Sequence, residues 1–308
     1  MPSGGGTTPP QTGAGSMKKK KEHYWYILPS LLTLVAIVIF PTIFLYYMSL
    51  TNYDLTMGWE QRKLVGIRNY QYLAFEDNDF WYSMKISLGF MVFTVVVEFV
   101  LGLIIALLFN RRIRGKRLWM SFLIIPMVIT PTIISLIWKL MLNTEYGVLN
   151  FLLSLLSIHK VNWLGYESAL WSVMMVDIWE WTPFVALILY AGLQSLPQEP
   201  YEAVVVDGAS PLQIFYYLTL PLLKPMILIS VLLRSIDSLK IFDMVYGLTQ
   251  GGPGNATELM SMHIYRIGFR HTNWIGRASA NAIVLLVIIT LLTTILLRIM
   301  KRGTKEGY

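Results

Sequence analysis

Six long apolar stretches constrain this chain more than any other feature of its sequence. They cover about residues 25–50, 82–109, 118–142, 169–193, 226–247 and 278–300. Each is near or above the roughly 20 residues that an α-helix needs to cross the hydrocarbon core of a bilayer. Charged residues make up only 14% of the 308 residues, whereas a soluble domain has about a quarter. The sequence therefore predicts an all-α integral membrane protein with six transmembrane helices in a single domain, residues 18–308.

The basic residues gather on one side of these spans. Lys and Arg cluster in residues 18–21, 111–117 and 298–305, while the first loop on the other side holds several acidic residues. Because cytoplasmic loops retain an excess of Lys and Arg, both termini are predicted to be cytoplasmic. The same distribution explains the net charge of +7 without a nucleic-acid partner.

Residues 1–17 are expected to stand outside the membrane domain. The first sixteen, MPSGGGTTPPQTGAGS, contain no charge and almost nothing apolar, a composition that cannot bury a core. We expect a disordered tail, either native or an added linker ahead of a natural start at Met17. The first span is too long for a cleaved signal peptide.

The sequence offers little for metal or thiol chemistry. It has no cysteine, which excludes disulfides, thiolate nucleophiles and cysteine-type zinc sites. Its histidines are scattered without a metal-binding spacing, so no metal site is expected.

Residues 200–225, PYEAVVVDGASPLQIFYYLTLPLLKP, form a short polar elbow between two apolar spans. Residues 201–206 suit two helical turns, and Gly208 permits the backbone reversal after them. Ser210, Pro211 and Gln213 then have the spacing of a capping box that starts a second helix. Leu212, Phe215 and Tyr216 share one apolar face of that helix, which Pro221 and Pro225 are expected to end. A face this small is too narrow for a core and favours docking into a groove on a partner.

The residues of this elbow resemble the EAA loop of ABC importer membrane subunits. The matching positions are Glu202, Ala203, Asp207, Gly208, Ala209, Phe215, Leu220 and Pro221. Two positions depart from the pattern by apolar exchanges, Val204 where a small residue is usual and Leu218 where Ile is usual. The resemblance implies that a coupling loop, residues 195–224, contacts a partner ATPase, with Glu202 as a polar contact and Gly208 needed for the turn.

The resemblance extends over nearly the whole chain after Met17. Segments 65–70 (VGIRNY), 126–138, 163–165 (WLG), 248–254 (LTQGGPG), 265–266 and 276–280, together with Gly147 and Asn150, are similar to those of type I carbohydrate-uptake permeases of the maltose and glycerol-phosphate kind. This implies a prokaryotic plasma (inner) membrane location and a heterodimer with a second homologous permease subunit. It also implies two copies of an ABC ATPase and an extracellular substrate-binding protein. Since no G-x-x-x-x-G-K-[ST] motif occurs, no cofactor and no catalysis are expected of this chain, and ATP with Mg belongs on the partner ATPases.

Ionisable residues inside the spans are costly, so they are expected to face a wet cavity or each other. The fourth span holds Asp177 and Glu180. The fifth holds Arg234, Asp237, Lys240 and Asp243, which alternate in sign at i, i+3 spacing and are predicted to form a ladder that partly neutralises itself. Glu98, the only acidic residue of the second span, receives no role.

The depth of these residues in the bilayer and the resemblance to sugar permeases indicate which of them contact the substrate. Transport sites lie near the bilayer midplane, and Trp181 and Asp237 are close to the midpoints of their spans. By resemblance, the contacts fall at Glu180, Trp181, Phe184, Asp237 and Lys240. Carboxylates and an ammonium group suit sugar hydroxyls, and aromatic rings suit the apolar face of a pyranose.

The predicted function is therefore a permease subunit that imports a sugar or oligosaccharide by alternating access. The same machine carrying glycerol phosphate or another polyol is the nearest alternative. An ion-driven secondary carrier, with the buried carboxylates as ion sites, and a membrane scaffold without transport are alternatives from other classes.

Overall fold

The computed structural model describes residues 26, 28–270 and 273–305. In chain order the α-helices are α2 (Phe40–Ser49), α3 (Arg68–Phe75), α4 (Asn78–Asn110), α5 (Lys116–Val128), α6 (Pro131–Met141), α7 (Val148–Leu155), α8 (Ala169–Gln194), α9 (Glu199–Val206), α10 (Pro211–Ile214), α11 (Leu220–Leu239), α12 (Asp243–Leu248), α13 (Met260–Tyr265) and α14 (Ile275–Lys305). No strand occurs in this part of the chain, and Thr51 and Leu64 form one isolated bridge. The predicted all-α membrane fold is confirmed.

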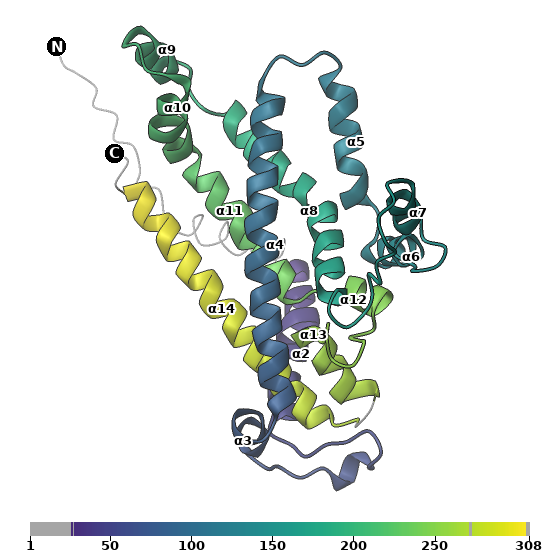
Figure 1. Ribbon diagram of the computed structural model, residues 1–308. Coiled ribbons are helices and arrows are strands. Elements are labelled where there is room, and N and C mark those ends of the chain that lie inside the picture. Colours follow the sequence, from purple (N-terminus) through teal and green to yellow (C-terminus); the bar gives the residue numbers. More distant parts are fainter. Residues whose placement is uncertain (1–25, 27, 271–272, 306–308) are drawn as a thin grey trace, which may run out of the picture.

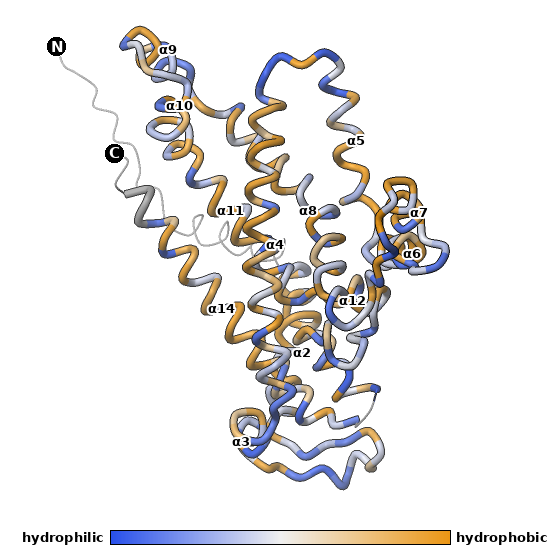
Figure 2. Tube along the Cα trace, in the orientation of Figure 1, coloured by the Kyte–Doolittle hydropathy of each residue, from blue (hydrophilic) through white to orange (hydrophobic). Residues whose placement is uncertain are grey.

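The longest helices run along the length of the molecule, with α9 and α10 at one end and α3 at the other (Figure 1). Among the described residues, five helices are long and apolar enough to cross a membrane, and a bent pair can supply a sixth span. Apolar residues dominate the middle of the long helices, whereas the connections at both ends are hydrophilic (Figure 2). This pattern matches a bilayer around the helices and water at the two ends.

Helices α4 and α8 form the centre of the bundle, and a glycine lets them approach closely. A Cβ added to Gly102 of α4 would lie 2.8 Å from Cγ1 of Val185 on α8 and 3.1 Å from the backbone nitrogen of Ala186. Small residues commonly allow such close packing between membrane helices. A Cβ added to Gly89 on the same helix would have nothing within 4 Å, so this position faces open space.

We expect Gly102→Leu to destabilise the bundle by about 1–3 kcal/mol, because the added side chain must push apart two helix backbones. Gly89→Leu is the matched control on the same helix and should change stability little, since its side chain enters open space. Thermal unfolding of both variants in detergent checks the prediction. Equal melting temperatures for the two variants would contradict it.

The predicted third span, 118–142, is wrong as a continuous helix. It is divided into α5 and α6, whose axes differ by 95°. Ile129 and Thr130 are both extended, with ψ of 138° and 139°, and Pro131 begins α6. A proline disfavours the helical conformation in the residue before it and fits the first turn of a new helix, which explains the break.

The predicted fifth span, 226–247, is wrong at both ends. The helix begins much earlier, because α10, a π-helical turn (Phe215–Thr219) and α11 together form one candidate span, Pro211–Leu239. It also stops earlier, since Lys240 leaves the helix and a separate α12 follows. Of the predicted ladder, the i, i+3 pair of Lys240 with Asp237 forms, whereas Asp243 begins a separate helix and does not continue it.

Pro221 and Pro225 do not end the elbow helix, which corrects a second prediction. The π-helical turn lies directly before Leu220 and Pro221, where it widens the backbone spiral. A proline lacks the N–H of the helical bond and clashes with the carbonyl four residues earlier. A π-turn is one of the backbone irregularities with which a helix accommodates such a residue, so α11 continues past both prolines.

Candidate functional site

A cavity of about 260 Å³ lies between α8, the C-terminal part of α11 and the segment that joins α11 to α12. Its ionisable lining residues are Asp177, Glu180, Arg234, Asp237, Lys240 and Asp243, and Trp181 and Pro131 contribute to its wall. Four acidic side chains thus face two basic ones. The break after Leu239 turns the chain across the cavity, which is why residues on either side of the break line the same space.

Arg234 is fully buried at the side of this cavity and is held by two carboxylates from other helices. Its Nε donates to Oε2 of Glu98 at 2.6 Å, and its Nη2 donates to Oε1 of Glu98 at 2.7 Å and to Oδ2 of Asp177 at 2.9 Å. The predicted ladder gave Arg234 its neighbours on the same helix as partners, and this was wrong. The ion-pair cluster instead links α4, α8 and α11.

The guanidinium of Arg234 also lies 5.0 Å from the ring centroid of Trp181, close enough for a cation–π contact. Its charge is therefore engaged by two carboxylates and an aromatic ring. Glu98 is the group that sequence reasoning left without a role. The only signal was a single carboxylate in an apolar helix, which did not reveal its partner.

Glu180 differs from its neighbours because neither oxygen of its carboxyl group has a hydrogen-bond donor among the described residues. Its side chain is buried, yet neither carboxylate oxygen has a hydrogen-bond partner among the described residues, and the same holds for Oδ1 of Asp177. Buried carboxylates are normally paired or hydrogen-bonded, since an unpaired one is costly. The cavity therefore offers acceptor atoms to a ligand that brings hydrogen-bond donors.

The structure also places the other residues that were predicted to contact the substrate. Lys240 pairs with Asp237, with Nζ 3.0 Å from Oδ1, and both side chains are about half exposed. Trp181 lines the cavity. Phe184 does not line it: its ring meets Trp181 edge to face at 6.1 Å, and it packs against an apolar cluster of residues from α4, α8 and α11. The structure thus brings together four of the five predicted contacts.

The turn and the capping box of the elbow have the conformation that the sequence predicts. Gly208 has φ of +77°, and the capping box is formed, since the Ser210 hydroxyl accepts from the Gln213 backbone and the Gln213 side chain accepts from the Ser210 backbone. The Tyr201 hydroxyl donates to the Thr219 hydroxyl at 3.1 Å and ties α9 to the second helix. The two helices therefore form one preorganised unit.

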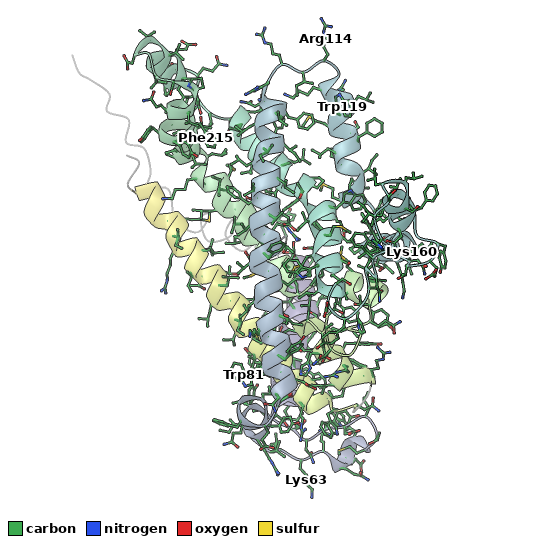
Figure 3. All side chains as sticks on the ribbon, viewed as in Figure 1. Lys63, Trp81, Arg114, Trp119, Lys160 and Phe215 are labelled. Atoms are coloured by element: carbon green, nitrogen blue, oxygen red, sulfur yellow. The ribbon has the colours of Figure 1, made fainter. Side chains whose placement is uncertain are left out.

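The elbow presents an apolar surface at one end of the molecule. Val206 is 87% and Tyr217 82% exposed, and Val205, Leu212 and Tyr216 are also exposed. A hollow of about 410 Å³ lies beside Gly208. Glu202, Ala203 and Asp207 are exposed, whereas Phe215 is half-buried and meets Tyr216 edge to face. Figure 3 labels Phe215 at this end of the molecule. Exposed apolar side chains on a rigid helical unit are typical of a docking surface.

A polar network at the opposite end joins α13 and the residues around it to the start of α4, and its central residue, His263, lies outside the candidate spans. His263 shares a short hydrogen bond with Glu258, and its Nε2 lies 3.7 Å from Asp77, the cap of α4. Arg266 bridges Glu258 and Asp79. Burial alone lowers the pKa of His263, but hydrogen bonds and charges from Asp77 and Glu258 raise it above its ordinary value. The contacts of His263 with Glu258 and Asp77 hold α13 against the start of α4.

Comparison with known proteins assigns this fold to a family. A family model described as the binding-protein-dependent transport system inner membrane component matches residues 98–306. The chain belongs to this family. It is a multi-pass membrane component of a transport system, as the resemblance in the sequence predicted.

Individual proteins agree with this assignment. The chain is 39% identical over 278 residues to the trehalose/maltose transport system permease protein MalF of Thermococcus litoralis, covering 89% of this chain and 91% of that protein. It is 32% identical over 274 residues to the sulfoquinovosyl glycerol transport system permease protein SmoG of Agrobacterium fabrum, covering 89% and 88%. A solved bacterial ABC transporter involved in alginate import has a similar chain, with a TM-score of 0.81, 21% identity, and coverage of 94% and 98%. The solved structure supports the fold, and the curated relatives support the family.

Proposed function

We propose that this chain is one of two homologous permease subunits of an ATP-driven importer for a sugar or short oligosaccharide. The observation that carries the proposal is the buried Glu180 carboxylate, which has no donor in the described chain and lies beside Trp181 in the central cavity. A hydroxyl-rich ligand supplies such donors, and an aromatic ring packs on its C–H face. The names of the relatives MalF and SmoG concern carbohydrates and their derivatives, which supports the same substrate class.

The charges of the cavity favour a neutral sugar over glycerol phosphate. Arg234 is engaged by Glu98 and Asp177, and Lys240 is paired with Asp237. Asp243 adds a carboxylate that forms no ion pair with a described residue, so acidic side chains outnumber basic ones in the cavity lining. Because like charges close together are unfavourable, a phosphate would be repelled by these carboxylates.

The proposed mechanism is alternating access driven from the elbow. Two ABC ATPase subunits would bind ATP and Mg and dock on the elbows of this chain and its homologous partner. Their closure would favour one arrangement of the spans over another, and only such a difference in affinity can shift the equilibrium. The elbow and the C-terminal end of α14 lie at the same end of the molecule, which we assign to the cytoplasm (Figure 1). Substrate would arrive on a binding protein at the opposite end.

Reconstitution tests this function directly. The chain would be placed in liposomes with its partner permease and ATPases, and a binding protein loaded from a panel of sugars would be added outside. We expect one loaded binding protein to stimulate ATP hydrolysis and uptake. No stimulation by any loaded protein, with a normally assembled complex, would refute the proposal.

Glu180→Gln is expected to lower uptake at subsaturating substrate at least about tenfold, because a carboxylate forms stronger hydrogen bonds with hydroxyl groups than an amide does. Initial uptake rates across a range of binding-protein concentrations provide the measurement. Glu145→Gln is the control, since Glu145 is an exposed carboxylate that pairs with Lys160 outside the cavity. Unchanged uptake in Glu180→Gln would remove this residue from the substrate site.

The unpartnered Glu180 would also suit an ion-driven carrier, in which the carboxylate binds a proton or sodium. The two mechanisms differ in their energy source. Uptake that survives an ionophore while ATP is maintained supports the ATP-driven importer. Uptake that collapses under those conditions supports the carrier.

A further inference from the structure

A second polar cavity, of about 420 Å³, lies at the end of the molecule opposite the elbow. It is formed by the loop after α2, by α3 and by the start of α14. This place in the fold is separate from the cavity that holds Glu180, and the two cavities share no lining residue. On the topology proposed above, this cavity faces the extracellular side.

The walls of this outer cavity are fixed by backbone contacts. The Gly276 backbone nitrogen donates to the Tyr53 carbonyl at 3.0 Å, and the Asn69 side chain donates to the carbonyls of Ser49 and Thr51. A Cβ on Gly276 would lie 2.1 Å from the Thr51 carbonyl oxygen, so only glycine allows this close approach. The first residues of α14 are therefore held against the loop, and the cavity is preformed.

Arg277 is held in this cavity by two aromatic rings. Its guanidinium carbon lies 3.7 Å from the ring centroid of Tyr72 and 3.9 Å from that of Trp274. Stacking restrains the planar group, so its N–H edges have a defined direction. Such an orientation reduces the entropy lost when a ligand forms hydrogen bonds with the guanidinium.

The basic groups of the outer cavity have no acidic partner in the described chain. Arg68 and Arg277 both line it, and neither forms an ion pair with a described residue. By contrast, Arg266 at the same end is neutralised by Asp79 and Glu258. Glu76 is the acidic residue in the lining, so the basic side chains exceed it, and the N-terminus of α14 adds positive character.

We propose that the outer cavity is the anchor for a carboxylate side chain of the substrate-binding protein. A planar guanidinium binds a carboxylate through two parallel hydrogen bonds, and arginine and aromatic residues are the usual centres of binding energy at interfaces. A protein side chain is favoured over a transported sugar acid because the cavity lies at the molecular end, away from the central site. The proposal rests on the function proposed above, because it requires a binding protein that docks at this end.

The test compares the affinity of the sugar-loaded binding protein for wild-type and variant transporters in nanodiscs. Arg277→Glu and Arg68→Glu are each expected to weaken binding at least about tenfold. Arg277→Lys should be intermediate, because lysine keeps the positive charge but cannot form the two parallel hydrogen bonds of a guanidinium. Arg62→Glu is the matched control. Arg62 lies in the same loop, stacks on Trp59 at 3.7 Å and does not line the cavity.

The possible results distinguish a failure of the outer-cavity proposal from a failure of the proposed function. Normal affinity in both glutamate variants would overturn the anchor while leaving the importer intact. An equal loss in Arg62→Glu would also overturn it, because the effect would then come from the general charge of this end. Failure of every loaded binding protein to bind the wild-type complex would overturn both proposals. Size-exclusion profiles confirm that each variant is assembled, and Arg68→Glu keeps the test valid if Arg277→Glu does not fold.

Discussion

Arg234→Met is expected to destabilise the folded permease by about 3–5 kcal/mol, because it leaves buried carboxylates without their counter-ion. Glu98 has no exposed surface, and its two oxygens each accept a hydrogen bond from Arg234. Asp177, also fully buried, loses the same partner. Since the three residues come from α4, α8 and α11, the loss weakens the centre of the bundle. Thermal unfolding in detergent measures the change.

Two comparisons identify the cause of this loss. Lys240→Met removes a cation from the central cavity whose ion pair is about half exposed, and such pairs contribute about 0–1 kcal/mol. The combined variant Glu98→Gln, Asp177→Asn, Arg234→Met removes all the charges of the cluster and should recover part of the stability. If Arg234→Met melts at the wild-type temperature, the cluster does not stabilise the bundle. If the combined variant is as unstable as Arg234→Met, unpaired charge is not the reason.

Hydropathy predicted the bounds of helices that run unbroken through one apolar stretch. It failed where the backbone geometry, rather than the apolar character, determines where a helix ends. The fourth span was predicted as 169–193 and is Ala169–Gln194, because its apolar run is bounded by polar residues on both sides. The third span contains the dipeptide Thr130–Pro131, which breaks the helix although the two halves together remain apolar enough for a span. No proline or glycine marks the break after Leu239, so neither the hydropathy nor the turn residues of the sequence revealed it.

The elbow and the ion-pair cluster also differ in how well the sequence predicts them. The elbow could be read from the sequence because its turn and capping box are local, and Gly208, Ser210 and Gln213 specify them over a few residues. The ion-pair cluster could not, because Glu98 lies 136 residues from Arg234 and nothing local connects them. Spacing along one helix suggested the ladder partners instead. Long-range pairing inside a membrane bundle requires knowledge of how the helices pack.

Gly208→Val is expected to reduce ATP-driven uptake at least about tenfold while membrane insertion and assembly remain intact, by combining about 1–2 kcal/mol of backbone strain with a new branched group at the docking surface. Gly208 has φ of +77°, which a β-branched residue rarely adopts. Nothing lies within 4 Å of the position that its Cβ would take, so the side chain would project from the elbow. It would therefore obstruct the proposed ATPase contact and tilt α9 against α10. Uptake and ATP hydrolysis in liposomes measure the effect.

Gly115→Val separates coupling from strain alone. Gly115 has φ of +72° and nothing within 4 Å of its added Cβ, and it lies in the loop between α4 and α5 at the same end of the molecule. The two variants thus carry similar strain on the same side, but Gly115 is outside the elbow. Insertion should be equal in both, and uptake should fall much further in Gly208→Val. Equal losses of uptake would mean that strain anywhere at this end disables the permease, and the elbow would lose its assigned role in coupling.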